Sequence, residues 1–254
     1  MSPTAEALRR SFVEGREPDS DEPEMESSLH YDQLALLVST LEWHWRGRDD
    51  FFVGANLSVY FRRDQSSRRE LRGPDFFVVR DVERRPRRSW TVWLEGGRYP
   101  DLIIELLSDE TARTDRTLKK TLYETVFRTP EYFWFSPETG ELSGFSLADG
   151  HYRPIAAGAR GHLPSGVLGL ALGVLDGLLR FYDDTGALVP TLPEAVLQER
   201  ALFEQERALV AKERALVEQE RARVAQERAR VAQEQARGDR LAAQLRALGV
   251  DPDQ

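Results

Sequence analysis

Two carboxylates and a lysine near the middle of the chain have the types and spacing that metal-assisted hydrolysis needs. Glu105 interrupts an apolar strand pattern at 102–107. A charge inside a buried strand costs on the order of several kcal/mol unless something pairs with it, and a bound cation is one such partner. Asp75 stands in a similar setting, between a Gly-Pro turn and a second apolar run, and Lys119 follows in a helical pattern.

This set of side chains is typical of metal-dependent phosphodiester cleavage. Two acids hold a hard cation through oxygen ligands, and a lysine orients or polarises the attacking water and the phosphate. Structural roles remain open for each residue: Asp75 capping its turn, Glu105 in a buried ion pair with an arginine or with Lys119, and Lys119 as that partner. Lys119 shares a helix face with Tyr123, whereas Lys120 lies about 100° around the helix and is expected to be solvated.

The surrounding pattern predicts alternating strands and helices that would position these side chains. Apolar residues three or four positions apart indicate a helix, whereas alternating apolar residues indicate a strand. The expected helices cover 29–46 and 112–127, the second capped by Ser108 or Thr111 and ended by Pro130. The expected strands cover 51–62, 75–79, 101–107 and 131–136, then a hairpin at 142–147 and 151–155, and a last pair near 180–182 with a turn at Gly186.

Composition limits the class of protein. The 254 residues are 41% hydrophobic and include no cysteine, which excludes disulfides, thiolate metal sites and cysteine nucleophiles. No apolar run reaches the roughly 18 residues of a membrane span, and the N-terminus lacks a signal-peptide core. We therefore expect a cytoplasmic protein without a membrane segment. The net charge of -8 argues against general polyanion binding.

One stretch departs from this acidic balance. Residues 62–98 hold eleven arginines and six acids, a local charge of +5. Within it, the excursion at 81–98 carries the basic run Arg84, Arg85, Arg87 and Arg88. The run is either a solvated charged loop or a contact for a nucleic-acid backbone beside the two carboxylates.

At this point several strings resemble the Uma-type putative restriction endonuclease family of the PD-(D/E)XK nuclease superfamily. The resemblance covers roughly residues 29–185. It rests on Gly73-Pro-Asp-Phe-Phe-Val-Val79, Pro100-Asp-Leu-Ile-Ile-Glu-Leu-Leu-Ser108, the stretch 111–119, Tyr123, and Thr129-Pro-Glu-Tyr-Phe-Trp-Phe-Ser-Pro137. It implies an α/β (α+β) fold with a restriction-endonuclease-like core, in which a mixed sheet is flanked by helices.

The resemblance also implies roles for individual residues. Asp75 matches the first acid of the superfamily motif and Glu105 the second, so these two would bind Mg²⁺ or Mn²⁺. The motif lysine is expected at residue 107, where this chain has leucine, and Lys119 occupies the matching place in the following helix. His30 matches a histidine at the start of the family's first helix, and Asp101 belongs to the second Pro-Asp pair. Both are possible accessory residues.

The C-terminal part of the chain has a different organisation. We expect a flexible acidic leader at 1–28, a nuclease-like domain at 29–190, and a long helix at 194–248. Glu-Arg-Ala recurs every seven residues from Glu199, which predicts a candidate coiled coil and hence a homodimer. The alternative is a solvated single helix, held by pairs such as Glu220 with Arg223 and Glu227 with Arg230.

Two functions follow from these observations. The first is a metal-dependent DNA endonuclease in which Asp75 and Glu105 hold the cation and Lys119 assists the water or the phosphate. The second is a catalytically silent nuclease fold that acts as a coiled-coil interaction or regulatory module. The acid–acid–lysine set favours the first, and the acidic balance with the long tail favours the second.

Overall fold

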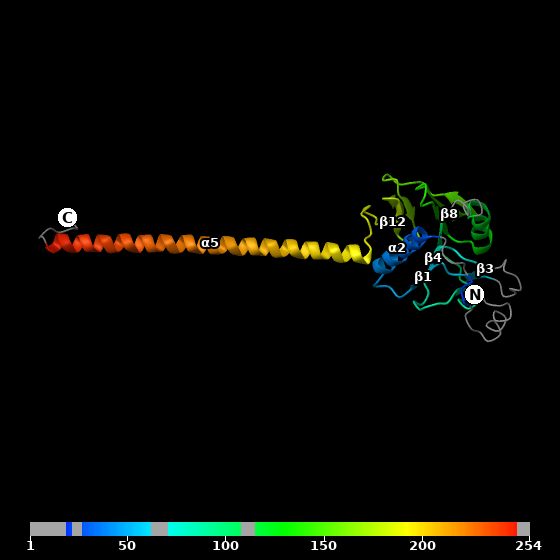
Figure 1. The fold of residues 1–254 in the computed structure, drawn as a ribbon, viewed down its shortest axis with the longest axis horizontal. Helices are drawn as coiled ribbons and strands as arrows, with labels where there is room; N and C mark the ends of the chain where they lie inside the picture. The colour runs from blue at the N-terminus through cyan, green and yellow to red at the C-terminus, as the bar shows by residue number, and fades with distance from the viewer. Residues whose placement is uncertain (1–18, 22–26, 62–70, 108–114, 248–254) are drawn as a thin grey trace. The chain divides into compact units, whose positions relative to one another are not determined.

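The computed structural model describes residues 19–21, 27–61, 71–107 and 115–247 (Figure 1). The chain divides into two units, Met1–Pro193 and Glu194–Gln254. Within the described residues, no helix is both long enough and apolar enough to cross a membrane.

A six-stranded mixed sheet is the centre of the first unit. Its strands are β1 (Phe51–Ala55), β4 (Phe76–Arg80), β6 (Leu102–Leu106), β7 (Glu131–Phe135), β8 (Leu142–Ala148) and β9 (His151–Pro154), side by side in that order. All neighbours are antiparallel except β6 and β7. The parallel pair requires a crossover, which the helical segment 115–127 supplies. The mixed α/β fold expected from the sequence is therefore confirmed.

Alternating side chains send two apolar faces to opposite sides of this sheet. Phe76, Val78 and Ile104 pack on one side with leucines of helix α2 (Ser28–His44). Phe77 and Ile103 belong to the opposite cluster, together with aromatic residues of the segment 115–127. The sheet thus separates α2 from the crossover helix, and each strand residue's parity determines which of the two it meets.

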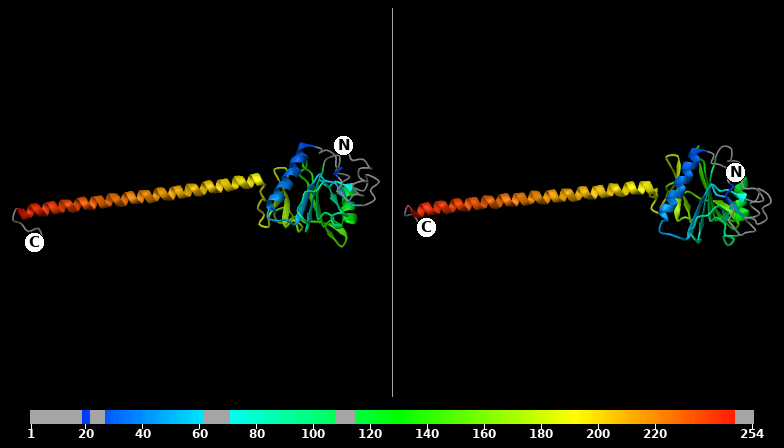
Figure 2. Two further views of the ribbon diagram at one scale, coloured as in Figure 1. Left: turned by 90° about the horizontal axis from the view of Figure 1, so that it is seen from below. Right: turned by 60° about the horizontal axis from the view of Figure 1, so that its bottom comes forward.

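A second, three-stranded sheet covers the α2 side. It consists of β10 (Leu163–Ser165), β11 (Leu170–Leu175) and β12 (Leu178–Tyr182). The buried Gln33 side chain of α2 donates to the Leu179 carbonyl and accepts from the Leu179 amide, at 3.0 and 2.9 Å. Both views of Figure 2 show α2, in blue, beside these yellow-green strands. The two hydrogen bonds connect α2 to β12.

The structure adds a turn to the one expected near the last strand. The last strand pair turns at Asp176 and Gly177, whose φ angles are 51° and 78°, as a two-residue hairpin with two left-handed positions requires. The turn expected at Gly186 is also present: the Gly186 amide donates to the Asp183 carbonyl at 2.9 Å, and the chain returns beside β12 through an antiparallel bridge between Tyr182 and Leu188.

The expected strand 51–62 is also divided. Asn56 has a φ of 45°, a left-handed conformation that interrupts extended structure after β1. The chain then joins a small sheet of β3 (Leu71–Arg72), β2 (Val59–Tyr60) and β5 (Trp90–Thr91). In this sheet β5 pairs in parallel with β2. Trp90 and Thr91, which belong to the arginine-rich excursion at 81–98, are therefore buried in the core.

The crossover helix is described from Asp115 onward. It contains the π-helical stretches η2 (Asp115–Lys119) and η3 (Tyr123–Phe127) on either side of α4 (Lys120–Leu122). It ends at Phe127 because Arg128 is left-handed, at a φ of 54°, two residues before Pro130. The expected caps Ser108 and Thr111 lie outside the described residues.

The beginning of the chain is described only in part. Of the stretch expected as a flexible leader, residues 19–21 make hydrogen bonds to the small sheet. The Ser58 amide donates to the Ser20 hydroxyl at 3.0 Å, and the Tyr60 hydroxyl donates to the Asp19 carbonyl at 2.9 Å. These three residues are attached to the domain.

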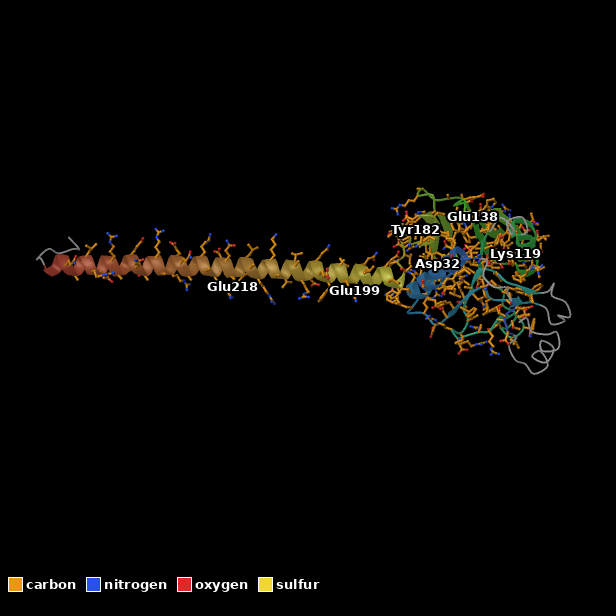
Figure 3. The ribbon with its side chains drawn as sticks, in the orientation of Figure 1. Asp32, Lys119, Glu138, Tyr182, Glu199 and Glu218 are labelled. Carbon is orange, nitrogen blue, oxygen red and sulfur yellow. The ribbon has the colours of Figure 1, made fainter. Side chains whose placement is uncertain are left out.

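Helix α5 (Leu192–Ala247), 56 residues long, provides the described part of the second unit, from Glu194 onward. At about 1.5 Å per residue its axis measures about 84 Å. Figure 3 shows side chains standing out around it, with Glu199 and Glu218 labelled. Glu220 pairs with Arg223 at 2.8 Å as expected, whereas Arg230 pairs with Glu234 at 3.3 Å instead of with Glu227.

Candidate active site

Asp75 and Glu105 face each other across two neighbouring strands. In the antiparallel pair β4–β6, Phe76 lies opposite Ile104, and extending that register by one residue places Asp75 opposite Glu105. Directly opposed residues have Cβ atoms about 4.5–5.5 Å apart. Both acids have the parity of Phe77 and Ile103, so they belong to the sheet face that the crossover helix covers.

Glu105 is fully buried, with 0% of its surface exposed, and both of its carboxylate oxygens are hydrogen-bonded. The Tyr123 hydroxyl donates to Oε1 at 2.7 Å, and the Lys119 amine donates to Oε2 at 3.0 Å. Burial and the negative charge of Glu105 raise the pKa of the Tyr123 phenol well above its usual value. Tyr123 therefore remains a hydrogen-bond donor throughout the neutral range.

Asp75 accepts hydrogen bonds from two other elements. Its Oδ2 atom accepts from the Leu106 amide at 2.7 Å, and its Oδ1 atom lies 3.4 Å from Nε2 of His30. Burial by itself would raise the pKa of Asp75. The hydrogen bond from His30 and the positive charge of Lys119 outweigh burial, so the pKa lies below its ordinary value. Asp75 is thus ionised at neutral pH.

The first turn of α2 places His30 against this site. The Ser27 side chain caps the helix by accepting from the His30 backbone amide at 3.2 Å. Ser27 is a favoured N-cap residue because its hydroxyl satisfies an amide that has no partner inside the helix. The cap and the buried face of α2 together position the His30 ring next to Asp75.

Asp101 lies elsewhere. It precedes β6, four residues before Glu105, a distance of about 13 Å along a strand. Its Oδ2 atom accepts from the Arg80 backbone amide at 2.8 Å and lies 3.9 Å from the Arg98 guanidinium. These contacts connect the start of β6 to the end of β4, and the structure does not bring Asp101 together with the two opposed acids.

The four arginines of the basic run divide into different environments. The Arg87 side chain is only 1% exposed, forms two hydrogen bonds to the Glu95 carboxylate, and lies over the rings of Phe52 and Trp90. The Arg85 guanidinium also contacts Glu95, at 2.6 Å. Arg87 is therefore part of the domain interior and is not presented to a ligand.

The other two arginines of the run lie at the surface. The Arg84 guanidinium lies 5.0 Å from the Phe51 ring centre and 3.7 Å from Glu42. The Arg88 side chain is 70% exposed and lies 3.2 Å from Asp19. Arg84, Arg88 and the half-exposed Arg85 therefore leave positive charge at the surface, as a contact with a nucleic-acid backbone requires.

The helix beside the site differs from expectation at Lys120. Its amine lies 3.4 Å from the centre of the Phe145 ring, and burial lowers its pKa. Lys120 is therefore half-buried, and not fully solvated as expected. Its neighbour Lys119, labelled in Figure 3, is the lysine that reaches Glu105. Tyr123, four residues further along the helix, was not among the predicted site residues, although its spacing from Lys119 places both on one helix face.

The residues at this site suit a hard divalent cation in their chemistry. Asp75 and Glu105 supply carboxylate oxygens, and an oxygen that accepts one hydrogen bond keeps a second lone pair. Among the residues that the structure describes, no group of three His, Asp or Glu side chains is gathered as a metal site. Mg²⁺ commonly uses one or two carboxylates together with water and substrate phosphate, so two acids are a sufficient protein contribution.

Fold and site together define a mixed α/β protein with two opposed strand carboxylates and a helix-borne lysine. Residues 22–176 match the family model Uma2, described as "Putative restriction endonuclease", and the chain belongs to this family. No curated protein matches the chain. A solved structure described as a putative nuclease belonging to DUF820, from Anabaena variabilis ATCC 29413, is similar at 12% identity and a TM-score of 0.44. The alignment covers 65% of this chain and 90% of that one.

Proposed function

We propose that the chain is a Mg²⁺- or Mn²⁺-dependent DNA endonuclease whose active site contains Asp75, Glu105 and Lys119. The observation that carries the proposal is the register of β4 and β6, which sets the two acids opposite each other on the face where Lys119 reaches Glu105. Membership of the family described as "Putative restriction endonuclease" supports the same activity.

Each residue has a definite task in this proposal. Asp75 and Glu105 would hold the cation, which when bound polarises the phosphate and lowers the pKa of a water nucleophile. Asp75 is ionised at neutral pH, and His30 holds its Oδ1 side. The Lys119 side chain, which is 21% exposed, orients water or contacts a phosphate oxygen of the scissile group.

We propose that Arg84, Arg85 and Arg88 contact the DNA backbone outside the site. Their guanidinium groups are exposed or half-exposed, and bidentate donors of this type suit phosphate. The buried Arg87 is excluded from this role and supports the loop that carries the other three.

The test combines cleavage with metal binding. Wild type should nick supercoiled plasmid in Mg²⁺ or Mn²⁺, and Glu105→Gln should lose both cleavage and the calorimetric Mn²⁺ signal. Lys120→Met is the matched control, because Lys120 lies beside Lys119 but contacts Phe145. Mn²⁺ binding that survives in Glu105→Gln would overturn the proposal.

A catalytically silent nuclease fold is the second candidate, favoured by the Lys119–Glu105 ion pair, which balances the buried charge without a cation. In that case the wild type would bind no Mn²⁺ under the same conditions. The two functions differ in this one calorimetric result, whatever α5 contributes.

We also propose that α5 joins two copies of the chain. Val210, Val217, Val224 and Val231 recur every seven residues along it and are exposed. Two shallow grooves lie along the helix fourteen residues apart: one is lined by Phe203, Glu206, Arg207, Val210, Ala211 and Arg214, the other by Val217, Glu220, Arg221, Val224, Ala225 and Arg228. Their glutamate and arginine rims suit a second copy, since each sign meets its opposite there.

A further inference from the structure

The two oxygens of Glu105 differ in the kind of partner each has. Oε1 accepts from the Tyr123 hydroxyl, and the tyrosine is fully buried. Oε2 accepts from the Lys119 amine, and that side chain keeps contact with solvent. A buried donor has no water to exchange with, whereas a lysine at the surface can be hydrated when it leaves its partner.

Packing fixes the Tyr123 donor in place. Its ring centre lies 5.3 Å from that of Phe127 and 5.6 Å from that of Tyr132. Aromatic neighbours at this spacing restrict the ring to one position. Oε1 is therefore held by a group that the domain core immobilises.

We propose that the two oxygens have separate tasks: Tyr123 is a positioning residue that orients Glu105 through Oε1, and Lys119 occupies Oε2 until a divalent cation replaces its amine there. This inference rests on the proposed endonuclease function and describes how that site is regulated. An ammonium group and a divalent cation at the same buried oxygen repel each other strongly, so only one is accommodated. The displaced Lys119 amine becomes available to water or a phosphate oxygen.

The two partners of one carboxylate should then affect metal affinity in opposite directions. Lys119→Met removes the competitor, and we expect Mn²⁺ to bind about 5-fold more tightly or better. Tyr123→Phe keeps the ring but removes the hydrogen bond that orients the ligand, and losses of about 10- to 100-fold are typical of such changes. If both residues had only structural roles, their replacement would not separate metal affinity in this way.

The experiment is Mn²⁺ calorimetry and metal-free thermal unfolding of the full chain. Lys120→Met and Tyr152→Phe serve as matched controls, because Lys120 contacts Phe145 and the Tyr152 hydroxyl donates to the Thr129 carbonyl at 3.0 Å. We expect tighter Mn²⁺ binding and a lower metal-free Tm in Lys119→Met, weaker binding in Tyr123→Phe, and wild-type affinity in both controls.

Two outcomes distinguish this inference from the proposed function. If wild type binds Mn²⁺ through Glu105 but Lys119→Met binds no tighter, or both variants change affinity in one direction, the division of tasks is wrong and the endonuclease proposal stands. If neither wild type nor Lys119→Met binds Mn²⁺, both are wrong. Binding that appears only in Lys119→Met would mean that the cation does not replace Lys119 in wild type, which overturns the exchange and favours the catalytically silent fold.

Discussion

His30 and Asp75 come from different sides of the main sheet, yet Nε2 of His30 lies 3.4 Å from Oδ1 of Asp75. Helix α2 packs on the sheet face opposite the two acids, and its first turn extends to Asp75, directly before the start of β4. The contact therefore joins α2 to the candidate site, and it is one cause of the lowered pKa of Asp75.

The first prediction concerns acid stability. Because the folded-state pKa of Asp75 lies below its unfolded value of about 3.9, the ionised carboxylate stabilises the fold above about pH 4. That contribution disappears as the pH falls through the folded-state pKa. The difference in unfolding free energy between wild type and Asp75→Asn should therefore increase with pH in the acid range and then level off. Urea unfolding of the metal-free proteins at several pH values measures it, and a difference that decreases with rising pH would contradict the assignment.

The second prediction concerns the charge of Glu105. Glu105→Gln keeps the side-chain volume and an acceptor for the Tyr123 hydroxyl, but it removes the charge that attracts Lys119. The Lys119 amine can then be hydrated by solvent. We expect the metal-free protein to lose about 1–2 kcal/mol of unfolding free energy. Glu105→Ala should lose more, because it also leaves the buried Tyr123 hydroxyl without its acceptor. Equal stability of Glu105→Gln and Glu105→Ala would show that the hydrogen bond to Tyr123 contributes little.

The third prediction separates Arg87 from Arg88. Arg87→Ala removes a buried partner of Glu95 and the contacts with two aromatic rings, so we expect a loss of about 2–4 kcal/mol. Arg88→Ala should stay within about 0.5 kcal/mol of wild type, since the side chain is exposed. In DNA titrations, Arg88→Ala should lower the salt dependence by about one phosphate contact. A large stability loss in Arg88→Ala would disprove the distinction.

The fourth prediction tests association through α5. The double variant Val217→Lys, Val224→Lys places charges in the valine column and should convert a dimer to a monomer in sedimentation of the full chain. Gln219→Lys with Gln226→Lys is the control, because two residues along a helix correspond to about 200° of rotation and so to the opposite face. If both pairs of changes leave the same subunit number, α5 is not the element that joins copies.

Local pattern was enough to predict β4 and β6, which position the two acids, and their neighbour β7, because all three are apolar runs bounded by turn residues. An Asp-Gly pair between two apolar runs is itself a hairpin signal, and Asp176–Gly177 carries the same signal as Asp149–Gly150 between the predicted strands 142–147 and 151–155. The break at Asn56 had a weaker signal, because asparagine tolerates the left-handed conformation without requiring it.

Contacts between distant residues could not be predicted in this way. The burial of Arg87 depends on Glu95, Phe52 and Trp90, which the fold brings together from different segments. The sequence of the basic run does not distinguish Arg87 from the other three arginines. Lys119 and Tyr123 share a helix face by spacing, but which of them meets which oxygen of Glu105 depends on the crossover between β6 and β7.

The two grooves on α5 lie fourteen residues apart and have nearly identical linings, so the helix offers the same docking position twice. A partner helix that fits one groove fits the other after sliding by about 21 Å. Two α5 helices paired in an aligned register fill both grooves on each chain. A pair staggered by fourteen residues leaves one groove on each chain empty. An empty groove can bind a further copy of the chain, so a staggered register would give an open, growing assembly instead of a closed dimer.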